Sequence, residues 1–423
     1  MLNSIESNNP ENRVELLMPK ILPFRGYRYN PQIFANLTHV LAPPYDVISP
    51  ELRKNLIHRS EHNIVNLTLA TKSNGVADKN HYSTAANLSS RWKRDGILTS
   101  AGKPSIWQVT ESFRDEDGIE MKRFGYLALV KLEDYSTDGI RRHERTHKAA
   151  KEDRYRLLDA THMNFSPIFF VFNDDDRSCE VLMNRFPSET VQTGTLDFET
   201  DVNLQIEQTS DEEWIDSFSS MLANKPILIA DGHHRYETAR TYHSNQSGSE
   251  LYSDYVLAYL VPSSSEGLQI LPTHRGLFGL SSNQTEQLQQ GLNRFFTTEQ
   301  PSDSTTLLSV IIGDDKLTKY YLDDDVNSSF LDVEVFEEVI LKKTLGFSED
   351  DIANKSQLAY FHNRRNCLKA VTDGTINAAF IMEALTVNKL MKSTEDGSVL
   401  PQKSTFFFPK IGAGMVMQSL EMI

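Results

Sequence analysis

The chain has 423 residues, of which 39% are hydrophobic and 24% are charged, so it can bury at least one large core and favours two or three domains. Its longest apolar runs, such as Val256 to Val261, are far shorter than the roughly 20 residues that cross a bilayer, and the N-terminus carries no export or organelle signal, so we expect a cytoplasmic protein with no membrane partner. A net charge of −15 disfavours nucleic acid as a partner, and two cysteines without C-x-x-C spacing disfavour a disulfide framework or a cysteine-based zinc site.

Short apolar runs alternate with helical patterns along the chain, which is typical of an α/β fold with mixed sheets. The predicted strands are Ser105 to Val109, Gly125 to Lys131, Pro167 to Phe172, Pro226 to Ala230, Asp254 to Val261, Leu308 to Ile312, Ala378 to Ile381 and Thr405 to Phe408. We expect a flexible N-terminal tail over residues 1–15, an α/β region over residues 16–280 and a further C-terminal α/β domain over residues 281–423, because polar stretches flank Leu268 to Leu280.

The first candidate binding element is Ala42-Pro43-Pro44-Tyr45-Asp46. Its two prolines hold an extended backbone that presents Tyr45 and Asp46, and Arg25 lies upstream on a segment expected to approach them. These three side chains are candidates for binding a substrate or a phosphate. A purely structural turn explains the same residues equally well.

The segment from Arg141 to Arg156 is basic, with seven Arg or Lys residues against three acidic ones. Within it, His143-Glu144-Arg145-Thr146-His147 matches an H-E-x-x-H pattern, which on a helix places two zinc-binding histidines on one face and a Glu beside the bound water. The charged Arg145, the polar surroundings and the lack of a third ligand at the usual spacing count against a zinc hydrolase. The plain alternative is an exposed helix on which Glu144 pairs with Lys148.

A strand, a turn and a helix are predicted in succession over residues 226–243. Pro226 to Ala230 is apolar, Asp231-Gly232 is a turn pair in which Asp231 is placed to start or cap the helix, and His234 to His243 is the helix. His233, His234 and Arg235 in the first turn conflict with the positive field of a helix N-terminus, so we expect an anion there. A phosphate fits, because free N–H groups and an Arg fork match its oxygens. Solvated side chains, or pairing with an acid such as Glu237, are the alternative.

Two further cationic segments follow. Leu271-Pro272-Thr273-His274-Arg275 ends an apolar strand with His274 and Arg275, which face either an anion or solvent. Gly397 to Ser404 differs from a P-loop at Gln402, and a strand follows it instead of the helix that would receive phosphate, so we reject a P-loop.

The string ADGHHRYETA resembles the signature of the ParB/sulfiredoxin superfamily, in which an Asp-Gly-His-His-Arg strand-turn-helix cradles nucleotide phosphates. More broadly, the chain resembles the bacterial and archaeal family called domain of unknown function 1015. The segments that carry this second resemblance, besides the turn at Asp231, are Pro23 to Gly26, Ala42 to Ile48, His143 to Thr146, Lys151 to Arg154, Leu271 to Arg275 and Lys403 to Lys410.

Two differences narrow the choice within the superfamily. Sulfiredoxins carry a reactive Cys where this sequence has His233, and partition proteins carry Glu-Arg-Arg in the turn and need a basic DNA-binding domain, which a charge of −15 does not support. The free serine kinases match best, since they share the Asp-Gly-His-His-Arg string and a His-Glu pair on an earlier helix, which here is His143-Glu144.

The resemblance implies a ParB/sulfiredoxin-like core that uses ATP or another nucleotide, with Mg²⁺, to phosphorylate a hydroxyl-bearing metabolite such as free serine. Glu144 or Asp231 would take the hydroxyl proton or hold Mg²⁺. The residues expected to bind the nucleotide are Gly232, His233, His234 and Arg235. The further residues expected to contact substrate or phosphate are Lys151 and Arg154, on or near the helical face of Glu144, and Lys403, Ser404 and Lys410 around the last strand.

Two other functions remain open. One is a nucleotide-binding regulatory protein, in which nucleotide occupancy switches a partner interaction without phosphorylating a metabolite. The other is a zinc hydrolase that uses His143, Glu144 and His147. The sequence leaves open which nucleotide and which acceptor bind, and the oligomeric state.

Overall fold

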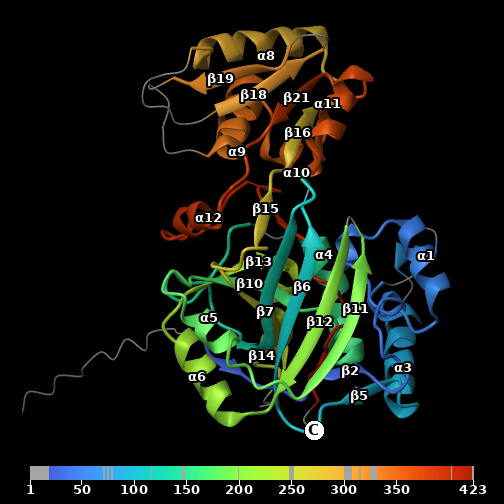
Figure 1. The fold of residues 1–423 in the computed structure, drawn as a ribbon. Helices are drawn as coiled ribbons and strands as arrows, with labels where there is room; N and C mark the ends of the chain where they lie inside the picture. The colour runs from blue at the N-terminus through green and yellow to red at the C-terminus, as the bar shows by residue number, and fades with distance from the viewer. Residues whose placement is uncertain are drawn as a thin grey trace, which may run out of the picture.

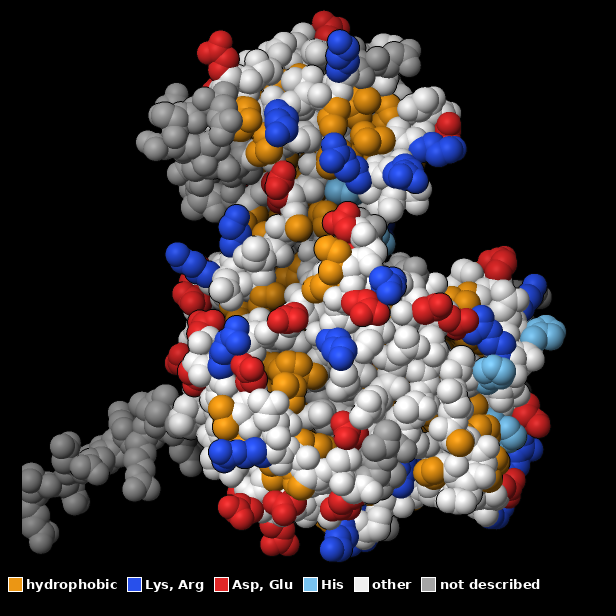
Figure 2. Space-filling model, viewed as in Figure 1, with side chains coloured by type: hydrophobic (Ala, Val, Ile, Leu, Met, Phe, Trp, Pro, Cys, Tyr) orange, Lys and Arg blue, Asp and Glu red, His pale blue; other side chains and the backbone are white. Residues whose placement is uncertain are grey.

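The computed structural model describes residues 19–69, 72–73, 76–77, 80–115, 117–144, 148–198, 200–246, 252–299, 307–313, 316–323, 331–401 and 403–421. A larger body and a smaller lobe above it make up the molecule (Figure 1). Figure 2 shows a narrow waist between them, where hydrophobic side chains gather on the face in view. The predicted α/β fold class is confirmed, because helices and strands alternate in both parts. The predicted tail, residues 1–15, lies outside the described residues.

The body is built on a nine-stranded mixed sheet with the strand order β11-β12-β6-β7-β14-β10-β13-β8, in which β1 also pairs with β7. Its strands are β1 (Ile21–Leu22), β6 (Ile106–Arg114), β7 (Glu120–Lys131), β8 (Ile140–Arg141), β10 (Ile168–Phe172), β11 (Thr190–Asp197), β12 (Asp201–Thr209), β13 (Ile227–Asp231) and β14 (Tyr255–Pro262). The pairs β10–β14 and β13–β8 are parallel, and the other pairs are antiparallel. All residues of β10 and β14 are buried, which explains their continuous apolar sequences.

Both faces of this sheet are covered. One face packs against α5 (Ser178–Met183), α6 (Glu212–Leu222) and α7 (His233–Asn245), and the other against α3 (Asn80–Arg94), α4 (Lys148–Thr161) and the C-terminal residues. The remaining elements of the body are β2 (Tyr27–Tyr29), η1 (Tyr45–Val47), α1 (Pro50–Arg59), α2 (Val65–Thr68), β3 (Lys72–Ser73), β4 (Val76–Ala77), β5 (Leu98–Ser100) and β9 (Met163–Asn164). None of the described helices has the length and apolar composition that crossing a bilayer requires.

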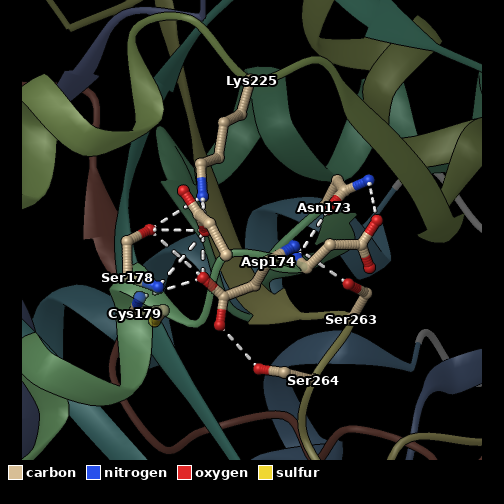
Figure 3. Close-up of polar contacts among 9 residues, drawn as sticks. Asn173, Asp174, Ser178, Cys179, Lys225, Ser263 and Ser264 are labelled. Carbon is tan, nitrogen blue, oxygen red and sulfur yellow. Dashed lines mark hydrogen bonds and ion pairs between the residues drawn. The ribbon is translucent and has the colours of Figure 1, made fainter.

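A buried carboxylate ties together the loops at the ends of β10 and β14. Asp174 accepts a hydrogen bond from Cys179 N at 2.9 Å and one from Ser264 Oγ at 2.6 Å, and Lys225 Nζ lies 3.6 Å from its Oδ1. Figure 3 shows Asp174 with the backbone nitrogen of Cys179 and the side chains of Lys225 and Ser264 around it. The Cys179 thiol beside it is buried, and burial raises its pKa, so this cysteine is poorly suited to redox chemistry. The cluster is therefore a structural connection within the body.

The lobe contains a six-stranded antiparallel sheet, in the order β17-β19-β18-β21-β16-β20. Its strands are β16 (His274–Leu277), β17 (Phe296–Thr297), β18 (Leu307–Ile312), β19 (Thr318–Leu322), β20 (Leu358–Phe361) and β21 (Ala378–Ile381). Its helices are α8 (Ser282–Phe295), α9 (Asp332–Val335), η2 (Phe336–Thr344), α10 (Glu349–Asn354) and α11 (Arg364–Thr372), and α12 (Val387–Ser393) lies at the waist. The lobe has a hydrophobic core of its own around Leu277, Leu308 and Phe380.

After the lobe, the chain returns to the body. We call residues 399–401 and 403–421 the return segment. Within it, β22 (Phe406–Phe408) pairs with β15 (Gln269–Leu271), and β23 (Gln418–Ser419) pairs with β9. Its apolar side chains, such as Phe407 and Met417, lie in the same core cluster as Phe169 and Leu127 of the large sheet. Chain beyond residue 281 therefore contributes to both parts of the molecule.

Each of the eight predicted strands overlaps a strand of the structure. The helix predicted after the Asp231 turn is also confirmed, since α7 spans His233–Asn245. The prediction that Glu144 lies on a helix is wrong. Helix α4 begins at Lys148, and His143 and Glu144 lie before it, just after β8. The Glu144–Lys148 pair was expected within one helix, but Glu144 precedes α4, and the side chain of Lys148 lies outside what the structure describes.

A buried ion pair in the large sheet gives a stability prediction. Arg123 Nε donates to Glu111 Oε2 at 2.6 Å and Tyr259 Oη donates to the same oxygen at 2.9 Å, while Glu111 Oε1 and both terminal nitrogens of Arg123 have no partner among the described residues. Both charged side chains are 0% exposed. Glu111→Leu alone should lower the free energy of unfolding by about 3–5 kcal/mol, because it leaves a buried, uncompensated guanidinium.

The double variant Glu111→Leu/Arg123→Met should be more stable than either single variant, because no charge is then left unpaired. Denaturant unfolding followed by fluorescence measures all four proteins of the cycle. A double variant that loses the sum of the two single losses would contradict this account.

Candidate functional site

The turn at the end of β13 is shaped by glycine. Gly232 has φ of 99°, a left-handed conformation, and a Cβ added to it would lie 3.0 Å from Arg235 Nη2. Glycine alone adopts this backbone without strain. Helix α7 begins at the next residue, and its first hydrogen bond runs from Tyr236 N to Gly232 O at 3.0 Å. The N–H groups of its first turn are therefore not used within the helix, which makes this end a suitable place for a phosphate.

Asp231 does not cap the helix, contrary to the sequence-based expectation. Its Oδ1 lies 2.8 Å from Lys410 Nζ and its Oδ2 lies 3.0 Å from Arg235 Nη2, so both oxygens are engaged by cations. Burial by itself would raise the pKa of Asp231, but Lys410 and Arg235 outweigh that effect and hold the pKa below its usual range. Asp231 is therefore an ionised carboxylate that holds two cations beside the start of α7.

Arg235 connects this turn to the neighbouring strand. Besides Asp231, its guanidinium donates from Nη1 to Ser166 Oγ at 3.0 Å and to the carbonyl of Pro167. Ser166 and Pro167 directly precede β10, which pairs with β13. The guanidinium is thus fixed where β13 ends and β10 begins.

His143 and Glu144 lie beside the turn because β8 runs parallel to β13. The ring of His143 bonds through Nδ1 to Ile229 O at 2.9 Å and through Nε2 to Thr405 Oγ1 at 2.7 Å. These partners imply a neutral ring that donates to the carbonyl and accepts from the hydroxyl. Burial lowers the pKa of His143 to about 4, which keeps the ring neutral near pH 7.

The ring of His233 is also neutral, and it contacts His143. His143 N donates to His233 Nε2 at 3.4 Å, and the two rings meet edge to face with centroids 4.6 Å apart. Burial and the neighbouring His143 lower the pKa of His233. The cations that contact Asp231 at the turn are Arg235 and Lys410, and the rings of His143 and His233 add no charge to them.

Glu144 is a partly buried carboxylate near those cations. Its Oε1 accepts a hydrogen bond from Lys403 N at 3.1 Å. Burial raises the pKa of Glu144, and the charges of Lys403 and Lys410 oppose that rise without cancelling it. Glu144 and Asp231 thus differ in kind: the first carboxyl takes a proton more readily than usual, and the second less readily.

The H-E-x-x-H pattern that begins at His143 does not form a metal site in the described residues. Both ring nitrogens of His143 are engaged by protein groups, which leaves neither for a metal ion in this arrangement. Within the described ranges, no three His, Cys, Asp or Glu side chains are grouped closely enough to hold an ion. His147, the second histidine of the pattern, lies outside the described residues.

A cleft of about 520 Å³, its open mouth included, adjoins Arg235. Arg154 lies in it with its guanidinium 4.0 Å from the centroid of the Tyr45 ring, and donates from Nη1 to Thr68 O at 2.9 Å. Burial raises the pKa of Tyr45, and the charges of Arg154, Arg235 and Asp231 also act on its hydroxyl. The cleft therefore brings Tyr45 and Arg154 to the edge of the Asp231 turn.

The other predicted residues are more scattered. Asp46 is exposed next to Tyr45, and Lys151 lies on α4, where its carbonyl accepts from Thr238 Oγ1 at 3.3 Å. Arg25 is exposed and lines a different small pocket with Tyr252 and Gln418. Arg25 is thus not brought to the turn.

His274 and Arg275 are buried in the lobe on β16. His274 Nδ1 accepts from Met382 N at 3.1 Å, so its ring belongs to the lobe. Arg275 instead reaches the return segment, where Nη2 donates to Lys403 O at 3.2 Å. Ser404 is buried and donates from Oγ to Pro401 O at 2.6 Å. His234 is partly buried in the first turn of α7.

Two side chains that hold the site were not foreseen. Thr405 fixes the ring of His143, and Ser166 accepts from Arg235. Thr405 lies 262 residues after His143, and a lone hydroxyl at the start of a predicted strand gives no signal of such a contact.

Known proteins resemble the chain as follows. The family model described as "Protein of unknown function (DUF1015)" matches residues 21–340. No curated protein matches the chain. A conserved hypothetical protein from Pyrococcus furiosus is 14% identical with a TM-score of 0.36, over 70% of this chain and 95% of its own.

Two further solved structures are similarly distant. A free serine kinase in complex with AMP is 12% identical with a TM-score of 0.37, over 68% of this chain and 91% of its own. SbnI with a C-terminal truncation, from Staphylococcus aureus, is 15% identical with a TM-score of 0.37, over 68% of this chain and 85% of its own. The assignment rests on the family model, which covers most of the chain: this protein belongs to the DUF1015 family of proteins of unknown function.

Proposed function

We propose that this protein is a nucleotide-dependent small-molecule kinase that transfers phosphate to a hydroxyl-bearing metabolite such as free serine. The observation that carries the proposal is the convergence of two carboxyl groups of opposite character, Glu144 and Asp231, with Lys410 and Arg235 at the start of α7. The resemblance of the Asp-Gly-His-His-Arg string to that of the free serine kinases supports the same reaction.

The nucleotide phosphates would bind at the N-terminus of α7. The N–H groups of its first turn, which have no acceptor within the helix itself, would offer donors there, and Arg235 and Lys410 would add positive charge at the same place. Asp231 holds both cations before the nucleotide arrives, so little side-chain entropy is lost when phosphate oxygens bind them. The cations also stabilise the charge that develops on the leaving diphosphate.

Glu144 is the better candidate for the general base. A base is most effective when its pKa lies close to the working pH, and burial moves the pKa of Glu144 in that direction. Asp231 is doubly paired with cations and is correspondingly a weak base. In the transfer, Glu144 takes the proton of the acceptor hydroxyl, the hydroxyl oxygen bonds to the γ-phosphorus, and the bond from that phosphorus to the bridging oxygen breaks, leaving a diphosphate.

Magnesium would be held mainly by the phosphates and by one carboxylate. Mg²⁺ in such sites keeps several waters and uses one or two carboxylates in addition to substrate phosphates. Glu144 has one oxygen that accepts from Lys403 N and a second that can reach a hydrated ion, whereas the ion would have to displace Lys410 from Asp231 Oδ1. Glu144 therefore fits a place beside the ion better than Asp231 does, and the ion, held mainly by the phosphates, would supply charge neutralisation of those phosphates.

A second candidate is a nucleotide-binding regulatory protein that does not phosphorylate a metabolite. The full pairing of Asp231 favours it, because a carboxylate that is occupied by two cations is suited to binding rather than to proton transfer. The two functions differ in whether nucleotide is consumed when an acceptor is present.

Incubation of the purified protein with Mg²⁺, a nucleotide and an acceptor separates these functions. ATP, ADP and CTP are each combined with a panel of hydroxylated metabolites that includes L-serine, and phosphorylated products are detected by mass spectrometry. We expect a product with at least one pair. Tight nucleotide binding without any product would favour the regulatory protein.

Glu144→Gln should lower kcat by about 10²–10⁴-fold, because it removes the proton acceptor and leaves the shape of the side chain. The KM for nucleotide should change little, since Glu144 does not hold the phosphate-binding cations. Glu213→Gln, an exposed carboxyl on α6, is the matched control and should keep wild-type kinetics. Wild-type kcat in Glu144→Gln would exclude this residue as the base.

Lys410→Met should weaken nucleotide binding by about 10–100-fold, the effect of losing one hydrogen bond to a charged phosphate oxygen. Isothermal titration calorimetry with ATP measures the change in Kd. Lys319→Met, which removes an exposed charge from the lobe, controls for the general loss of a cation. Equal affinity in the two variants would show that the cation beside Asp231 does not contact phosphate.

A further inference from the structure

One residue of the return segment stands between the candidate base and the lobe. Lys403 N donates to Glu144 Oε1 at 3.1 Å, and Lys403 O accepts from Arg275 Nη2 at 3.2 Å. The carboxylate belongs to the body and the guanidinium belongs to the lobe. A continuous chain of hydrogen bonds therefore links the lobe to Glu144 through the backbone of a single residue.

Arg275 is rigidly placed for this contact. It lies on β16, between β20 and β21, and is only 2% exposed. Its Nη1 donates to the carbonyl of Thr273, and its guanidinium lies 5.7 Å from the centroid of the Tyr360 ring. Burying an arginine is costly, and burial lowers the pKa of Arg275. The two terminal nitrogens of Arg275 bond backbone oxygens of two different segments. The buried cation therefore fixes the distance between these two segments.

The backbone at Lys403 is held in an unusual conformation. Its φ is 58°, in the left-handed region that residues other than glycine rarely adopt. Ser404 Oγ closes the preceding turn onto Pro401 O at 2.6 Å. Such a conformation persists only when its surroundings determine it. Here two hydrogen bonds hold the backbone of Lys403 in this conformation: its N–H donates to Glu144, and its carbonyl accepts from Arg275.

The return segment also forms hydrogen bonds with His143, the residue before the candidate base. Leu400 N donates to His143 O at 2.8 Å, and Thr405 Oγ1 bonds His143 Nε2 at 2.7 Å. With the bond from Lys403 N to Glu144, three contacts join His143 and Glu144 to residues 400–405. A displacement of this part of the return segment would therefore displace the carboxylate.

We propose that the lobe positions the carboxylate of Glu144, with Arg275 as a positioning residue that acts through the backbone of Lys403. The catalytic consequence rests on the kinase function proposed above, whereas the positioning itself does not. The lobe then contributes to the active site through the position that it gives to Glu144.

Hydrogen–deuterium exchange tests the positioning without any assay of activity. In Arg275→Met, the amides of residues 143, 400 and 403 should exchange about tenfold faster than in the wild type, the effect of losing roughly 1.4 kcal/mol of hydrogen bonding. The amides of β10 and β14 should keep their protection. Arg365→Met removes an equal charge from the exposed surface of α11 and should change none of these rates.

Arg275→Lys keeps the buried charge and guards against a lobe that fails to fold. A single ammonium cannot reproduce the two-nitrogen geometry that bonds Thr273 O and Lys403 O, so exchange at residues 143, 400 and 403 should also rise in this variant. If the amides of β16 and β21 lose their protection from exchange in Arg275→Met, the lobe of that variant is unfolded, and the test then rests on Arg275→Lys alone. Wild-type exchange at the three amides in the folded variant would overturn the positioning.

Kinetics then test the catalytic consequence. Arg275→Lys should lower kcat about tenfold and leave the KM for nucleotide unchanged, and it should cause no further loss when combined with Glu144→Gln, because both changes act on the same carboxylate. Additive losses, or a change confined to KM, would contradict an action through Glu144. If no variant and no acceptor yields product, the kinase function fails while the exchange result still stands or falls on its own.

Discussion

The neutralisation of Asp231 is the interaction on which the rest of this site depends. A buried carboxylate is expensive without partners, and this one is met by Arg235 from the same turn and by Lys410 from the far end of the chain. The first partner fixes α7 against β10, and the second requires the return segment to be docked on the body. The turn, the start of α7 and the C-terminal residues therefore adopt their places together. This coupling explains why the Asp231 turn is combined here with a residue 179 positions away in the chain.

Much of the fold could be predicted from the sequence, because its central strands are buried on both faces. Runs such as Val256 to Val261 are apolar at every position, which indicates a strand without any knowledge of its neighbours. The hairpin of β11 and β12 was not predicted, although Val202, Leu204 and Ile206 alternate with polar residues as a half-buried strand requires. Strand β8 has only two residues, and it exists because β13 offers it an edge, so no local pattern could reveal it.

Some features of the site could likewise be predicted from the sequence, and others could not. The Asp231 turn was predictable, since a buried strand, Asp-Gly and a helix follow one another locally. The placement of Glu144 on a helix was wrong because the segment around it is rich in residues that favour helices, whereas the pairing of β8 draws it into an extended path. The capping role given to Asp231 failed for a similar reason, since a cation 179 residues away competes for its carboxylate. Local propensity gives no access to such long-range partners.

The lobe is connected to the body by two strands that are bonded to each other. Gln269–Leu271 leads into the lobe, Phe406–Phe408 leads out of it, and the two form the antiparallel ribbon β15–β22 at the waist. The hydrogen bonds of this ribbon hold its two strands in one register, so the points where the chain enters and leaves the lobe lie side by side. Because both crossings lie side by side, the lobe has the topology of a unit inserted between β15 and β22, and its two ends meet at one place on the body.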